Sequence, residues 1–183
     1  MFSSATRFSC IAAFGLLGLA SCSKSTETAA PANRITFNDF EALDGWTPAN
    51  PSVTTVQAHS GRYSVKVDQE VEYSLGYSNL LGKASVSKLR KLRIHGWAFL
   101  AGPKSTASLV VQIVDPSQNN KIIFWDAVEL AKEVKKINEW SEITKEFNLP
   151  DNVEAAHQMK IYMWRRDAQQ PAYLDDLEIL KGE

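Results

Sequence analysis

The chain has 183 residues, of which 44% are hydrophobic and 22% are charged, and its formal net charge is −1. This length and apolar content suffice for one domain with its own hydrophobic core. The nearly balanced charge gives no electrostatic reason to expect nucleic acid as a partner.

Residues 1–21 are predicted to be a lipoprotein signal peptide. One positive charge, Arg7, precedes an apolar stretch at 8–20, which is too short to span a hydrocarbon core about 30 Å thick. The sequence Leu-Ala-Ser-Cys at 19–22 follows, and it resembles the lipobox of bacterial lipoproteins. The resemblance implies cleavage before Cys22 and diacylation of its sulfur, whereas the alternative is an ordinary secretory signal with a cysteine nearby. Ser23 stands where enterobacteria use aspartate for inner-membrane retention, so the outer membrane of the cell envelope is favoured.

The mature chain would keep no free thiol, because Cys10 leaves with the signal and Cys22 carries lipid. Residues 22–33 lack large apolar side chains and are predicted to be the lipidated cysteine followed by a flexible tether. Residues 34–183 are predicted to form one domain. The lipid anchor would be its only contact with the membrane.

From residue 34 onward, apolar and polar residues alternate with period two, which is typical of strands. Turn residues separate these runs. The predicted strands are 52–58, 63–67, 71–77, 92–99, 108–114, 121–127, 141–149, 159–164 and 172–180. Many short strands at such spacing predict an all-β fold, an antiparallel β-sandwich. Apolar residues at helical spacing in 127–137 predict a helical turn within a connection.

Three separated segments carry a resemblance when they are taken together. Residues 38–46 open the folded part, Ser-Gly-Arg-Tyr-Ser-Val-Lys-Val at 60–67 follows, and Tyr-Leu-Asp-Asp-Leu-Glu-Ile at 173–179 closes it. In this order they resemble the carbohydrate-binding modules of the galactose-binding-like superfamily, especially the cellulose- and xylan-binding group. The resemblance covers nearly all of 35–180. It implies a jelly roll that is galactose-binding-domain-like and holds a glycan, although a shared fold does not fix the ligand.

The resemblance also implies a structural Ca2+ ion where the first and last strands meet. Calcium takes six to eight oxygen ligands, and clustered carboxylates would repel each other without a cation. The candidate ligands are the carboxylates of Glu41 and Asp175, the backbone carbonyls of Asp39 and Arg62, and the neighbouring Asp176.

Asp175 shares the alternation of Tyr173, Leu177 and Ile179, which would point its side chain inward unless something binds it. A metal-free alternative stays open. In that alternative, Glu41 and Asp175 pair with Arg62 or Arg34 as surface salt bridges.

Aromatic side chains are the candidates for glycan binding, because sugar rings pack on aromatic faces while polar neighbours bind hydroxyls. The candidates on two strands are Arg93, His95 and Trp97, and Tyr162, Trp164 and Arg166; Trp125, Tyr73 and Tyr77 are weaker ones. The alternative is that these rings belong to the core, and Trp46 and Trp140 are assigned to the core or its rim. Whether both strands lie in one sheet stays open, and separate sheets would rule out a common platform.

No catalytic motif is recognisable. His59, His95 and His157 lack metal-ligand spacing, no Gly-x-Ser-x-Gly elbow is present, and the only clustered carboxylates are those of the predicted calcium junction. We therefore predict a non-catalytic glycan-binding lipoprotein. The alternatives are an interaction subunit that uses the same fold to bind an envelope protein or polymer, and a small hydrolase or lyase with an unrecognised site.

Overall fold

The computed structural model describes residues 30–183, and residues 31–183 form one compact unit. Cys22, the predicted signal peptide and most of the predicted tether lie outside the described residues. Within the described part, no helix is both long enough and apolar enough to cross a bilayer.

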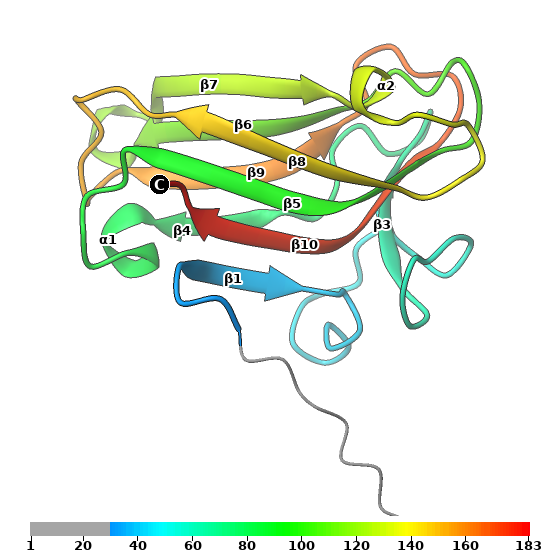
Figure 1. Cartoon of the computed structure of the whole chain (residues 1–183), viewed down its shortest axis with the longest axis horizontal. Helices are drawn as coiled ribbons and strands as arrows, with labels where there is room; N and C mark the ends of the chain where they lie inside the picture. Colours follow the sequence, from blue (N-terminus) through cyan, green and yellow to red (C-terminus); the bar gives the residue numbers. More distant parts are fainter. Residues whose placement is uncertain (1–29) are drawn as a thin grey trace, which may run out of the picture. The chain divides into compact units, whose positions relative to one another are not determined.

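The first sheet, sheet A, has six strands. They are β1 (Arg34–Asn38), β2 (Val53–Thr54), β3 (Ser64–Val67), β5 (Lys91–Leu100), β8 (Ser141–Asn148) and β10 (Ala172–Lys181). Their order is β2-β3-β10-β5-β8, and β1 pairs with the C-terminal half of β10 while β3 pairs with its N-terminal half (Figure 1). The first and last strands of the domain therefore lie side by side, as the resemblance implies.

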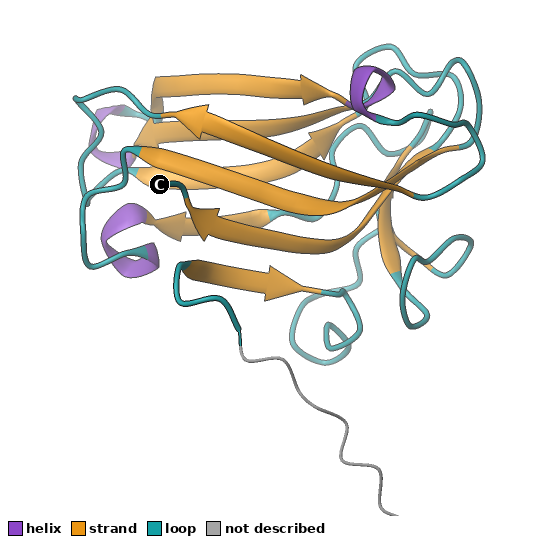
Figure 2. Ribbon diagram, in the orientation of Figure 1, coloured by secondary structure: helices purple, strands orange, loops and turns teal. Residues whose placement is uncertain are grey.

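The second sheet, sheet B, has four strands. They are β4 (Tyr77–Leu80), β6 (Ser108–Asp115), β7 (Lys121–Glu129) and β9 (Gln158–Trp164), in the order β4-β9-β6-β7. All named pairings in both sheets are antiparallel. Within residues 30–183, the strands and loops are interrupted only by α1 (Leu81–Ala84), α2 (Leu130–Glu133) and a 3-10 turn (Pro116–Gln118) (Figure 2). The all-β sandwich is confirmed, and α2 supplies the helical turn expected within 127–137.

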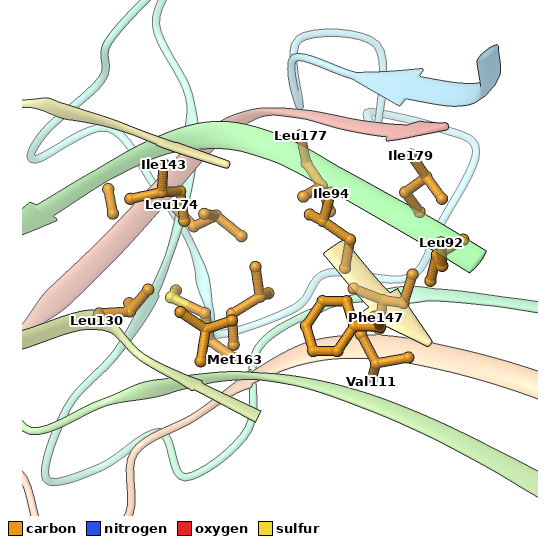
Figure 3. Packing of buried hydrophobic residues seen from close by; sticks show 14 of the residues in the cluster. Leu92, Ile94, Val111, Leu130, Ile143, Phe147, Met163, Leu174, Leu177 and Ile179 are labelled. Atoms are coloured by element: carbon orange, nitrogen blue, oxygen red, sulfur yellow. The ribbon is translucent and has the colours of Figure 1, made fainter. Parts of the chain in front are cut away.

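The core lies between the two sheets and follows from the period-two pattern. Leu92 and Ile94 point inward from β5, Phe147 from β8, Val111 from β6 and Met163 from β9, and none of them is more than 1% exposed (Figure 3). Burying a side chain of this size contributes about 1.5–3 kcal/mol relative to leaving it in water. The apolar core thus fixes which face of each strand is left outward for function.

A β-bulge in β10 corrects the expected orientation of Asp175. The register with β5 shifts between Asp175 and Glu178, and Asp176 has a positive φ of 48°. One extra residue inverts the alternation. Leu177 therefore points into the core, whereas Asp175 pairs with Trp97 and Tyr173 lies outside the core cluster. The expectation that Tyr173, Asp175, Leu177 and Ile179 share one inward face was wrong.

A second irregularity separates Tyr73 from Tyr77. Tyr73 forms a bridge with Trp164, while Tyr77 pairs with Ile161, so the segment gains one residue relative to β9. Tyr77 consequently packs against the core, and Tyr73 is 53% exposed. The regular strand β4 begins only at Tyr77, later than the strand predicted at 71–77.

The two tryptophans assigned to the core or its rim have different outcomes. Trp140 is half-buried and packs outside the core cluster, with its ring 5.5 Å from that of Phe99 and 5.8 Å from that of His59. Trp46 is 86% exposed, which corrects the expectation. It sits in a turn closed by its own N–H on the Leu43 carbonyl, and the preceding Phe40 fills the core instead.

Candidate functional site

The outward face of sheet B carries a row of large side chains. On β9, Met159, Ile161 and Met163 are fully buried, so the alternate residues Lys160, Tyr162 and Trp164 point away from the core. The ladder places Gln112 of β6 opposite both Lys160 and Trp125. One face therefore gathers residues from β6, β7 and β9.

Three aromatic rings on this face remain accessible. Tyr73 is 53% exposed and Trp125 is 47% exposed. The rings of Tyr73 and Tyr162 meet edge to face with centroids 5.8 Å apart, and the Tyr162 hydroxyl donates to Oε1 of Gln112 at 3.4 Å. Flat ring faces thus stand next to a hydrogen-bonding amide.

An open depression of about 380 Å³ lies over these residues. Its lining consists of Tyr73, Ser74, Gly76, Tyr77, Ser78, Gln112, Lys160, Ile161 and Tyr162. Gly76 allows the close approach of two chain segments there, since a Cβ at this position would lie 2.2 Å from the Ile161 carbonyl oxygen and 2.8 Å from the Cβ of Tyr162. The segment that contains Tyr73 and Gly76 therefore packs directly against β9.

Both tyrosine hydroxyls in the depression hold their protons more strongly than usual. The hydrogen bond with Glu72 raises the pKa of Tyr73, helped by partial desolvation and by the negative charge of Glu72. Burial raises the pKa of Tyr162. The two phenols therefore stay neutral hydrogen-bond donors over the whole physiological pH range.

Trp164 and Arg166 occupy the end of the same face. Trp164 is half-buried, and its indole N–H is buried without a hydrogen-bond partner among the described residues. The Arg166 guanidinium lies 3.5 Å from Oε2 of Glu129. These two residues border the depression's sheet but do not line the depression itself.

The candidates Arg93 and His95 on β5 lie in the other sheet, and both contact carboxylates of neighbouring strands. Arg93 lies 3.3 Å from Glu146, and the His95 Nε2 lies 2.8 Å from Glu142 and its Nδ1 3.7 Å from Glu178. These contacts run across neighbouring strands of sheet A. A sugar bound there would compete with these carboxylates for Arg93 and His95.

Trp97 is covered by a side chain from the 55–63 loop. The His59 ring stacks on Trp97 with centroids 3.8 Å apart and planes 11° apart, and its Nδ1 lies 2.6 Å from Oδ2 of Asp176. Trp97 belongs to sheet A and Trp164 to sheet B. Because the core separates the inward faces of the two sheets, their outward faces point in opposite directions, and no platform joins these tryptophans.

The two carboxylates predicted to bind calcium converge on one turn, residues 59–63. Glu41 Oε1 accepts the N–H groups of Arg62 and Tyr63 at 2.7 Å each. Asp175 Oδ2 accepts those of His59 and Ser60 at 2.8 and 3.2 Å. Gly61 allows this contact, since a Cβ there would lie 2.4 Å from the Glu41 carboxyl group.

The remaining acids of this junction are also bound by protein groups. Asp39 Oδ1 accepts the Glu41 N–H at 3.2 Å, and Asp176 Oδ1 accepts the Ser60 hydroxyl at 2.7 Å. Arg34 pairs with Glu178 at 2.5 Å, so the alternative salt bridge to Asp175 is not formed. Arg62 contributes its backbone N–H rather than its charge.

The carboxylates predicted to bind calcium thus have hydrogen-bond partners within the protein. In the part of the chain that the structure describes, no three His, Cys, Asp or Glu side chains are grouped to hold a metal ion. Burial raises the pKa of Asp175, and the N–H donors of His59 and Ser60 only partly offset this effect. Calcium binding by these residues stays a prediction from the resemblance.

Sequence reasoning missed Gln112 and Lys160. Both are polar residues on strands of sheet B, and Lys160 is two residues from Tyr162 on the same face. Because residues two apart on a strand point to the same face, the spacing of Lys160 and Tyr162 could have identified Lys160 as a site residue. Gln112 could be placed beside it only once the register of β6 against β9 was known.

The fold and the ring-lined depression define a β-sandwich of the carbohydrate-binding type. Residues 32–169 match the model of the family CBM_4_9, carbohydrate binding domain. Since this match spans well over half of the chain, the protein belongs to that family. The comparison with curated proteins gave no match.

Solved structures of similar fold are carbohydrate-binding modules. The CBM22-1 xylan-binding domain from Paenibacillus barcinonensis is 19% identical with a TM-score of 0.53, and the match covers 83% of this chain and 97% of that one. The CBM22-2 xylan-binding domain from the same organism is 16% identical, with a TM-score of 0.52 and coverages of 81% and 99%. A xylan-binding domain from CBM 22 is 18% identical, with a TM-score of 0.51 and coverages of 84% and 99%. At these identities the likeness establishes the fold.

Proposed function

We propose that the domain binds an oligo- or polysaccharide without changing it chemically, through the outward face of sheet B. The observation that carries this proposal is the depression in which Tyr73 and Tyr162 flank Gln112 and Lys160, with the exposed Trp125 on the next strand. Membership in a carbohydrate-binding family supports it, as do neighbours whose names specify xylan binding.

The chemistry of the depression suits a sugar. The C–H face of a pyranose packs on an aromatic ring, and amide, hydroxyl and ammonium groups bind its hydroxyls. Two or three stacking contacts of about 1 kcal/mol each, less the cost of immobilising the ligand, give a modest affinity. No carboxylate lines the depression, whereas glycoside hydrolysis normally needs two across a cleft. This lining supports binding rather than catalysis.

A glycan array that includes β-1,4-linked xylan tests the proposal. Tyr162→Ala and Trp125→Ala should each lower the affinity for the best glycan about tenfold, because each removes a stacking surface. Trp97→Phe is the matched control, since Trp97 lies on the outward face of sheet A, and it should leave the affinity within about twofold. Equal binding by all three variants would show that the ligand sits elsewhere.

We also propose that the domain is held at the bacterial cell envelope, at the outer membrane, by lipid on Cys22, so that it captures glycan for partner proteins. The support is the sequence at 19–22, which lies outside the described residues. Cells fed labelled palmitate should label the protein, and Cys22→Ser should abolish both the label and membrane fractionation. A labelled Cys22→Ser protein would contradict the anchor.

A further inference from the structure

Lys160 is the only charged side chain that lines the sheet B depression. The other lining residues are neutral, and none is an aspartate or a glutamate. Among the described residues, no carboxylate lies within ion-pairing distance of the Lys160 ammonium. A half-buried positive charge therefore stands in the depression without a counterion from the protein.

The neighbours of Lys160 explain why its charge stays uncompensated. On the flanking strands it pairs with Gln112 and Ser78, which are both neutral. Glu72, the neighbour of Tyr73 in the sequence, does not line the depression. At the other end of the face, Arg166 differs from Lys160 because Glu129 neutralises it at 3.5 Å.

The position of Lys160 relative to Tyr162 suits an acidic sugar. Residues two apart on a strand are separated by about 6.5–7 Å. A sugar ring stacked on Tyr162 would therefore bring its substituents within reach of the ammonium. A carboxylate forms a stronger, charge-assisted hydrogen bond with an ammonium than a neutral hydroxyl does.

We propose that the depression prefers glycans that contain uronic acid, whose carboxylate pairs with Lys160. This inference rests on the proposed function, because it assigns a ligand class to the same face of sheet B. It predicts a preference that is electrostatic in origin, so the preference should weaken as salt screens the pair.

Matched polymer pairs provide the test. Polygalacturonic acid, alginate and glucuronic-acid-substituted xylan are each compared with their carboxyl-reduced forms, which keep the backbone and lose the charge. Affinity electrophoresis and calorimetry at low and high salt measure the binding. We expect at least one acidic polymer to bind about three- to tenfold more tightly than its reduced form at low salt, with little difference at high salt.

Two variants separate charge from hydrogen bonding. Lys160→Gln keeps a hydrogen-bond donor without the charge, and Lys160→Met removes both. Both should abolish the preference for the acidic form. Lys83→Gln, at an exposed lysine of α1, is the matched control and should keep the preference. Melting curves identify any variant that fails to fold, and Lys160→Gln, as the milder change, then carries the test.

The outcomes distinguish this inference from the proposed function. Equal affinity for acidic and reduced polymers, unchanged in Lys160→Gln, would overturn the acidic preference and leave glycan binding intact. A preference that survives in Lys160→Gln would overturn the role of Lys160. No binding of any polymer in either form would overturn the proposed function and the inference together.

Discussion

The outward faces of the two sheets both carry aromatic residues, but these residues are covered on sheet A and exposed to solvent on sheet B. On sheet A, Phe99 and Tyr173 are 7% and 5% exposed, and Trp97 lies beneath His59. On sheet B, Tyr73 and Trp125 keep about half of their surface in solvent. An aromatic strand face therefore stays accessible to a ligand only where no neighbouring segment packs over it.

Hydrogen bonds to buried and half-buried carboxylates explain the cover on sheet A. Asp175 and Glu41 together bind four backbone N–H groups of the turn at 59–63. These bonds hold the turn, and the side chain of His59 reaches Trp97 from it. The segment over sheet A thus gains polar contacts that also satisfy its own backbone.

The largest expected contrast is between two tyrosines, one on each sheet. Tyr173→Ala should lower the free energy of unfolding by about 3 kcal/mol, because it empties a buried site beside Phe99. Tyr162→Ala should cost about 1 kcal/mol or less but weaken glycan binding about tenfold. Urea unfolding and calorimetric titration measure the two effects.

The comparison would break if the two tyrosines exchanged roles. Loss of glycan affinity in a folded Tyr173→Ala protein, with Tyr162→Ala unaffected, would place the ligand on sheet A. Tyr173→Phe is the control for the hydroxyl, since it keeps the ring in place and should retain most of the stability.

A smaller effect is expected from uncovering Trp97. His59→Ala removes the stacked ring and the contact with Asp176, so it should lower the free energy of unfolding by about 1–2 kcal/mol. A double-mutant cycle with Asp176→Asn should give a coupling of about 0.5–1 kcal/mol. Val56→Ala, at a 69% exposed position of the same loop, is the control and should change little. Additive effects would mean that His59 and Asp176 act independently.

Period-two alternation identified most strands and much of the core, because most core residues lie on strands. It could not locate the bulge in β10 or the irregularity between Tyr73 and Tyr77. Residues 173, 175, 177 and 179 alternate without a break in the sequence, yet one extra residue in the ladder sends them to opposite faces. A bulge is a property of the pairing between strands, and a single strand's pattern does not record it.

The candidate site was predicted only in part for a similar reason. Tyr162 and Trp125 were identified from the patterns of their own strands. That they lie on one face of sheet B depends on the strand order β9-β6-β7. The cover on Trp97 comes from His59, 38 positions earlier in the chain, through contacts that local patterns do not encode. Strand periodicity therefore predicted which residues point outward but not which of them stay accessible.

Chelation is expected to change the stability least. It tests whether Glu41 and Asp175 are bound by backbone N–H groups alone or also by a metal ion. If a calcium ion bound the native state, a free calcium concentration of 100 times its Kd would stabilise the fold by about 2.7 kcal/mol. For a domain of this size, that corresponds to a melting temperature roughly 5–10 °C higher. The resemblance predicts that EDTA removes this stabilisation. In the structure, however, Glu41 and Asp175 already accept backbone N–H groups, so we expect EDTA to leave the melting temperature unchanged. A drop of several degrees that Asp175→Ala abolishes would instead establish the calcium site, and would mean that a metal ion and not the peptide groups holds the turn over sheet A.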